Sequence, residues 1–200
     1  MVSGPSFGGF APRILHFDIE CRPLSWYGGD FVTREITAIA ALFRDEDEGY
    51  VWLLGVDDPV DMLLGFTELY DAADVVTGHF IRGFDLPNIQ GALDEYRLEA
   101  LGAKWTVDTK LDHHKRQGMS NSQENIAAEL EIEAPKVQMN QPKWRAGNRL
   151  TPEGIAFTRD RAIGDVKQHV EMYDALQAEG RLGEGKVWSP AAGNGKRYTP

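Results

Sequence analysis

Two carboxylates at the end of an apolar segment are the residues of this chain best suited to chemistry. Asp18 and Glu20 stand at the end of the largely apolar run Ile14–Phe17, which is typical of a buried strand. Because side chains alternate along a strand, both carboxylates point to the same face. Their charges repel, and a divalent cation between them removes that repulsion; oxygen ligands suit Mg²⁺ or Mn²⁺. A solvated strand end is the simpler interpretation of so short a pattern when it stands alone.

Two later segments supply further acids. Asp85 lies in Gly78-His79-Phe80-Ile81-Arg82-Gly83-Phe84-Asp85-Leu86-Pro87, which follows a short apolar segment. Asp165 lies in the last strongly periodic segment of the chain. Acids that come from three separate elements predict an acidic cluster that binds metal.

At these three places the sequence resembles the DEDD, or DnaQ-like, 3'→5' exonucleases of the ribonuclease H-like superfamily. Asp18-Ile19-Glu20 matches the first motif of that family, an Asp-x-Glu after an apolar strand. Residues 78–87 match the second motif, which is close to Gly-His-Asn-x-x-x-Phe-Asp-x-Pro. Asp165-Val166 matches the third motif, an Asp often followed by Val near the start of a late helix. The similarity runs from about Arg13 to Leu176 and is closest to a stand-alone phage or bacterial exonuclease.

This resemblance implies an α/β fold with a mixed central sheet flanked by helices. It also implies hydrolysis of phosphodiester bonds at the 3' end of single-stranded DNA with two divalent cations, Mg²⁺ or Mn²⁺. By analogy, Asp18 bridges both metals, and Glu20 and Asp165 complete the shell of the hydrolytic metal. Asp85 then binds the second metal through water, so all four acids are expected to be catalytic and metal-binding residues.

The residue that activates water departs from the family pattern. The family places a Tyr four residues before the last Asp, or a His five before it, and here those positions are Arg161 and Asp160. Arginine stays protonated and cannot act as a base. His169, one helical turn after Asp165, either is a surface histidine salt-linked to Glu171 or Asp165 or, as a catalytic residue, orients or deprotonates water. His169 and Asp174 also have the family's His-to-Asp spacing, which makes Asp174 the alternative last ligand.

Four residues are predicted to contact the substrate or shape its site. Phe80 replaces the usual Asn of the second motif and either stacks on a base or belongs to the core. His79 is expected to hold the strand–helix turn. Arg82 and Arg161 are expected to contact phosphate. Asp108, at a strand end, is expected to have a structural role.

Two alternative functions remain beside the leading one. The first is a nuclease of the same fold that acts on RNA or on a particular nucleic-acid structure. The second is a module that captures nucleic-acid ends and cuts poorly, because the family's Tyr or His and its Asn are replaced. Expected partners are the 3' end of single-stranded DNA, RNA as the alternative, and polymerase or replication proteins in DNA replication or repair.

Composition limits the class of protein. A net charge of -10 argues against broad nonspecific binding to polyanions. The basic groups at 110–116 and 136–149 are either a phosphate-contacting rim or solvated loops. One cysteine, Cys21, fits a reducing cytoplasm, and no apolar run is long enough to span a membrane. The resemblance implies that this cytoplasm is that of a bacterium or of a phage-infected host.

The elements needed to position the acids can be predicted from periodicity and from turn signals. Strands are expected at 13–17, 36–43, 50–54, 74–77 and 105–107, and helices at 59–70, from 87, at 126–130 and at 151–178. Residues 138–150 are expected to be irregular. The predicted domains are a flexible lead (1–12), an exonuclease domain (13–180) and a loosely ordered tail (181–200).

Overall fold

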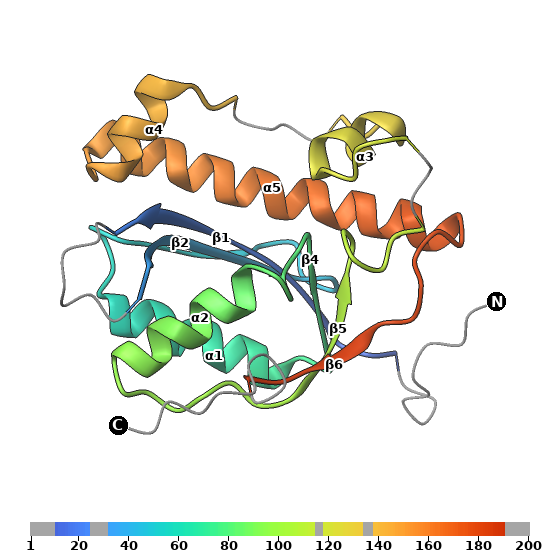
Figure 1. Cartoon of the computed structure of the whole chain (residues 1–200), viewed down its shortest axis with the longest axis horizontal. Coiled ribbons are helices and arrows are strands. Elements are labelled where there is room, and N and C mark those ends of the chain that lie inside the picture. The colour runs from blue at the N-terminus through green and yellow to red at the C-terminus, as the bar shows by residue number, and fades with distance from the viewer. Residues whose placement is uncertain (1–10, 25–31, 115–117, 134–137, 191–200) are drawn as a thin grey trace.

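A mixed sheet with the strand order β3-β2-β1-β4-β5-β6 is the framework of the computed structural model (Figure 1). The structure describes residues 11–24, 32–114, 118–133 and 138–190. The strands are β1 (Ile14–Pro23), β2 (Arg34–Phe43), β3 (Tyr50–Leu53), β4 (Val75–Gly78), β5 (Lys104–Asp108) and β6 (Lys186–Trp188). β1 pairs antiparallel with β2 and parallel with β4, which confirms the predicted α/β fold.

The helices lie on both faces of this sheet. They are α1 (Pro59–Ala72), α2 (Asp85–Glu95), α3 (Gln123–Glu129), α4 (Gln141–Asn148) and α5 (Pro152–Ala178). α1 and α2 cover one face, α5 runs along the other, and α3 and α4 pack against α5 (Figure 1). Among the described residues, no helix is both long enough and apolar enough to cross a membrane.

Alternation along β1 separates the apolar core from the polar side chains. Leu15, Phe17 and Ile19 are buried in the main core cluster, together with Phe66 of α1 and Ile89 of α2. The even-numbered side chains between them therefore point to the opposite face, which α5 covers. β1 thus supplies core packing on one side and the acids on the other.

The long helix α5 begins where the sequence predicts. The side chain of its N-cap residue, Thr151, accepts a hydrogen bond from the Gly154 backbone N–H, and Pro152 stands in the first turn. Ser122 caps α3 in the same way through the Asn125 backbone N–H. Short-range capping chemistry therefore fixed these two helix starts.

Residues 138–150, expected to be irregular, contain α4. Asn140 caps this helix by accepting from the Lys143 backbone N–H. The helix has eight residues and is mostly polar, so few apolar positions mark it in the sequence, and its contact with α5 stabilises it. Gly154 allows that contact, because a Cβ atom at this position would overlap the backbone of Ala146.

The predicted loose tail is also different in part. Residues 186–188 form β6, which pairs antiparallel with β5, and Trp188 joins the main core cluster. A strand of three residues is too short to show an alternating pattern in the sequence. Residues 191–200, and residues 1–10 of the predicted lead, lie outside the described residues.

Candidate metal centre

The polar face of β1 and one face of α5 meet in register. Two residues along a strand advance about 6.6 Å, and four residues along a helix advance about 6 Å. Residues two positions apart on β1 are therefore spaced like residues four positions apart on α5, so successive pairs can face each other. The facing pairs are Glu20 with Arg161, Asp18 with Asp165, and His16 with His169.

Three carboxylates converge at the centre of this register. Asp18, Glu20 and Asp165 each offer an oxygen atom, and the three atoms lie within 4.8 Å of one another. Asp85, the first residue of α2, lies on the wall of the same pocket, which has a volume of about 220 Å³. Its Oδ1 accepts a hydrogen bond of 3.1 Å from the Ile19 backbone N–H. All four predicted acids thus line one pocket.

Burial and the charges of neighbouring acids make Asp18 and Asp85 hard to ionise when no cation is bound. Burial raises the pKa of Asp18 well above its usual value, and the charges of Asp85, Glu20 and Asp165 raise it further. Burial also raises the pKa of Asp85 to about 7, although hydrogen bonding from the backbone opposes this shift. A group of buried oxygen ligands with unfavourable negative charge fits Mg²⁺ or Mn²⁺, because the cation would offset that charge.

Arg161 lies against two of the three converging acids. Its Nε is 2.5 Å from Glu20 Oε1, and its Nη2 is 3.2 Å from Asp165 Oδ2. Its Cζ lies 5.3 Å from the ring centroid of Trp144 on α4. Burial lowers the pKa of Arg161, but the two carboxylates raise it by more, so the guanidinium stays charged. The side chain expected to contact phosphate is thus ion-paired within the acidic pocket.

Asp108 holds the turn that leads into Asp85. It is fully buried and accepts hydrogen bonds of 3.0 Å from the backbone N–H groups of Phe80 and Arg82. Phe80 has a φ of 75°, an unfavourable angle for a residue with a side chain, and these bonds hold the turn in that conformation. Asp108 therefore has the structural role that its position at a strand end indicated.

Phe80 lies at the pocket rather than in the core. Its ring is partly exposed and lines the pocket, with Lys110 Nζ 4.2 Å from the ring centroid. His79 lines the same pocket, and its Nδ1 is 3.1 Å from Thr109 Oγ1. That contact ties His79 to the segment after β5.

Arg82 has a different position from the one predicted. Its guanidinium donates to both oxygen atoms of Asp112, at 2.9 and 2.5 Å, and its side chain is only 11% exposed. A bidentate pair of this kind is strong and directional. Arg82 therefore braces the turn against the segment after β5 instead of facing a phosphate.

His169 is also placed differently from the prediction. It is buried, with Nδ1 3.0 Å from His16 Nδ1 and Nε2 3.2 Å from Thr109 Oγ1. The Thr109 hydroxyl gives its proton to the Gly78 carbonyl oxygen, so His169 must donate from Nε2 and accept from His16 at Nδ1. Burial lowers the pKa of His169 well below its usual value and that of His16 to about 3. His169 thus belongs to a neutral network beneath the site: it is buried rather than salt-linked at the surface, and it does not line the acidic pocket.

The choice between Asp165 and Asp174 is clear in the structure. Asp174 pairs with Arg44 at 2.7 Å, and its side chain is 43% exposed. It faces away from the acidic pocket, whereas Asp165 is buried within it. Asp165 is therefore the late-helix acid that meets β1.

Several residues of the site were not recognised in the sequence. His16 could have been found, because it stands two residues before Asp18 and so shares its face. Trp144, Thr109 and Asp112 carry no local signal, since their roles come from contacts with distant segments.

Gly78, at the end of β4, is required by close packing behind the site. A Cβ atom there would overlap Ile81 Cγ2 and lie 2.6 Å from the Phe17 carbonyl oxygen, next to Asp18. We expect Gly78→Ala to lower the free energy of unfolding by about 1–3 kcal/mol, as overpacking does. Urea unfolding measures this. Gly102→Ala is the control, because a Cβ there meets nothing within 4 Å, and equal midpoints for both variants would contradict the packing argument.

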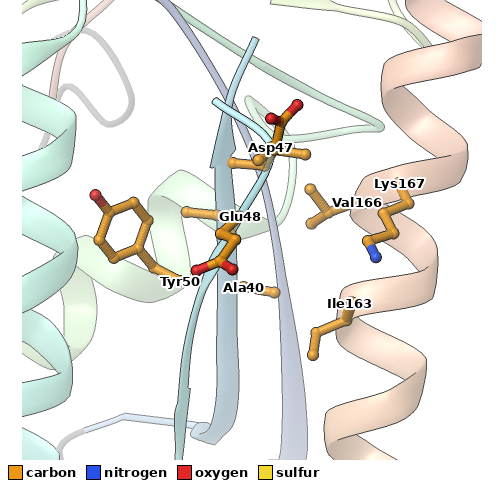
Figure 2. Close-up of a pocket in the computed structure, with 10 residues that line it drawn as sticks. Ala40, Asp47, Glu48, Tyr50, Ile163, Val166 and Lys167 are labelled. Carbon is orange, nitrogen blue, oxygen red and sulfur yellow. The ribbon is translucent and has the colours of Figure 1, made fainter. Parts of the chain in front are cut away.

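A second pocket, of about 260 Å³, lies between the β2–β3 hairpin and α5 (Figure 2). Lys167 extends from α5 toward the hairpin, which carries Asp47 and Glu48, while Ile163 and Val166 form an apolar wall. None of the four predicted metal ligands lines this pocket. The smaller acidic pocket is therefore the better candidate for chemistry.

Comparison with known proteins supports the fold. No protein-family model matches the sequence, and no curated protein does. Among solved structures, the chain is similar to the family B DNA polymerase from the hyperthermophilic archaeon Pyrobaculum calidifontis, with a TM-score of 0.62 and 17% identity. The match covers 84% of this chain but only 25% of the polymerase chain. The likeness shows a shared α/β fold, and its mixed sheet with helices on both faces is consistent with the ribonuclease H-like architecture.

Proposed function

We propose that this protein is a metal-dependent 3'→5' exonuclease that acts on single-stranded DNA. The observation that carries the proposal is the convergence of Asp18, Glu20 and Asp165, with Asp85 on the same pocket wall. These are the acids that the resemblance to DEDD exonucleases marks as metal ligands. The structural neighbour is a DNA polymerase, which supports a nucleic acid as the substrate.

The four acids have distinct roles in this proposal. Asp18, Glu20 and Asp165 would hold the hydrolytic metal ion, and Asp85 together with Asp18 would hold the second. Two bound Mg²⁺ or Mn²⁺ ions would supply an activated water and stabilise charge on the departing 3'-oxygen. Arg161 cannot accept a proton, so it cannot replace the family's Tyr or His in activating the water. We therefore assign the orientation of the attacking water to Glu20. His169 acts only as a positioning residue, through His16 behind Asp18.

The rim of the pocket supports a single strand as the substrate. Phe80 and Phe84 line the pocket, and each carries a cation over its ring, Lys110 at 4.2 Å and Arg34 at 5.2 Å. Aromatic rings stack on unpaired bases of any sequence, and nearby cations contact phosphates. A duplex end would have to melt before its bases could reach these rings.

One observation favours a second candidate, a module that holds nucleic-acid ends and cuts poorly. Arg161 stands at the position of the family's Tyr or His and is paired with two of the proposed ligands. If that pairing persists in the presence of metal, binding without turnover would result.

The test is a nuclease assay with matched oligonucleotides. We expect single-stranded DNA with a 3' label to release labelled mononucleotide in Mg²⁺ or Mn²⁺, and 5'-labelled DNA to shorten stepwise. Chelator should stop both reactions. Binding without turnover would favour the end-binding module, faster cleavage of matched RNA would change the substrate, and activity in chelator would contradict the metal mechanism.

A further inference from the structure

Arg161 pairs with two of the carboxylates that the proposed metal site needs. Its Nε pairs with Glu20 Oε1 and its Nη2 with Asp165 Oδ2. Those two carboxylates are two of the three whose oxygen atoms lie within 4.8 Å of one another. A guanidinium in this place and a divalent cation bound by the same carboxylates repel each other, so they cannot both remain there without cost.

The metal-free pocket also needs a cation of its own. Asp18, Glu20, Asp85 and Asp165 all line this one pocket, so their negative charges repel, and the Arg161 guanidinium is ion-paired with two of them, Glu20 and Asp165. Only 18% of the Arg161 side chain is exposed, so its ion pairs are weakly screened by solvent. Arg161 therefore does in the metal-free chain what a bound metal ion would do.

A second partner for the guanidinium lies next to it. The Trp144 ring on α4 has its centroid 5.3 Å from Arg161 Cζ. Indole is the aromatic ring that binds cations best, and the contact is worth more when partly desolvated. The guanidinium can therefore leave the carboxylates and still keep a favourable contact with the Trp144 ring.

We propose that Arg161 is a built-in counter-ion that competes with the divalent cation. It neutralises Glu20 and Asp165 in the metal-free chain, and metal loading displaces it toward Trp144, where it is able to contact a substrate phosphate. This inference rests on the metal site of the proposed function. It assigns to Arg161 a role in metal loading, separate from the phosphate contact predicted from the sequence.

Mn²⁺ binding to the full chain, measured by calorimetry, tests the competition. We expect Arg161→Gln to bind Mn²⁺ at least about tenfold more tightly than wild type, since the competing charge-assisted pairs are gone. Arg161→Lys keeps the charge but loses the guanidinium that pairs with both carboxylates, so its affinity for Mn²⁺ should lie between those of wild type and Arg161→Gln. Arg159→Gln is the matched control, because it removes the same charge from an exposed position on the same helix. It should bind like wild type.

Two further measurements do not depend on activity. Without metal, Arg161→Gln should melt at a lower temperature than wild type, and Mn²⁺ should raise its melting temperature by more than that of wild type. Mg²⁺ should change the tryptophan fluorescence of wild type, and Trp144→Phe should remove most of that change.

The outcomes separate this inference from the exonuclease proposal. Equal or weaker Mn²⁺ binding by both Arg161 variants, beside a wild type that binds metal and cleaves DNA, overturns the competition alone. Tighter binding by Arg161→Gln without any cleavage by wild type supports the competition and overturns the exonuclease. No Mn²⁺ binding by any of these proteins overturns both.

Discussion

Asp18→Asn is expected to lower the rate of nucleotide release by at least about 10³-fold, the largest effect of any single change. Asp18 is one of the three converging acids, and in the proposed function it would help to hold both metal ions. An amide carries no charge and cannot bridge two cations, so several kcal/mol of transition-state stabilisation would be lost. Single-turnover release of 3'-labelled mononucleotide in saturating Mn²⁺ measures the loss.

Asp174→Asn is the matched control for this experiment. It makes the same chemical change at an acid that pairs with Arg44 outside the pocket. We expect its rate to stay within a few-fold of wild type. If Asp18→Asn kept most of its activity, or if the two variants lost activity equally, the assignment of the metal ligands would be wrong.

Asp85→Asn is expected to make the metal-free protein more stable, which is unusual for a change in a buried residue. Burial raises the pKa of Asp85 from 3.8 to about 7, and each pKa unit corresponds to about 1.4 kcal/mol. The amide removes the ionisation penalty, and its oxygen can still accept the hydrogen bond from Ile19. At pH 8 in chelator, we expect a gain on the order of 2–4 kcal/mol in the free energy of unfolding.

The pH dependence of this gain follows from the direction of the shift. Below about pH 4 the carboxyl is protonated in both states and adds nothing to the difference. Between about pH 4 and pH 7 the unfolded chain loses the proton first, so the folded wild type binds more protons and its stability falls as the pH rises. The advantage of Asp85→Asn should therefore grow across this window and level off above it.

Urea unfolding in chelator at pH 4.5 and at pH 8 measures the gain. Asp94→Asn is the control, because Asp94 is an exposed acid of the same helix, and we expect little change at either pH. Saturating Mn²⁺ should reverse the order, since wild type then gains binding free energy that the variant lacks. If Asp85→Asn were less stable than wild type in chelator at pH 8, the ionised Asp85 carboxylate would not destabilise the folded chain, and this prediction would be wrong.

The resemblance pointed to the four acids, and local features of the sequence were enough to predict most of the elements that carry them. The alternation along β1 placed Asp18 and Glu20 on one face, and Thr151 with Pro152 marked the start of α5. These signals work because they depend on neighbours within one or two turns of the chain. By contrast, α4 and β6 were missed, because each is held by contacts with a distant element.

What the sequence alone determined is therefore the set of carboxylates, their strand and helix supports, and the α/β class of the fold. Only the tertiary structure decided which side chains meet them. Arg161 reaches Glu20 across 141 positions, and His169 reaches His16 across 153. Those contacts depend on the register of α5 along β1, which is set by packing over the whole domain and has no local pattern. For that reason the acids were predictable, whereas the cation between them and the neutral histidines beneath them were not.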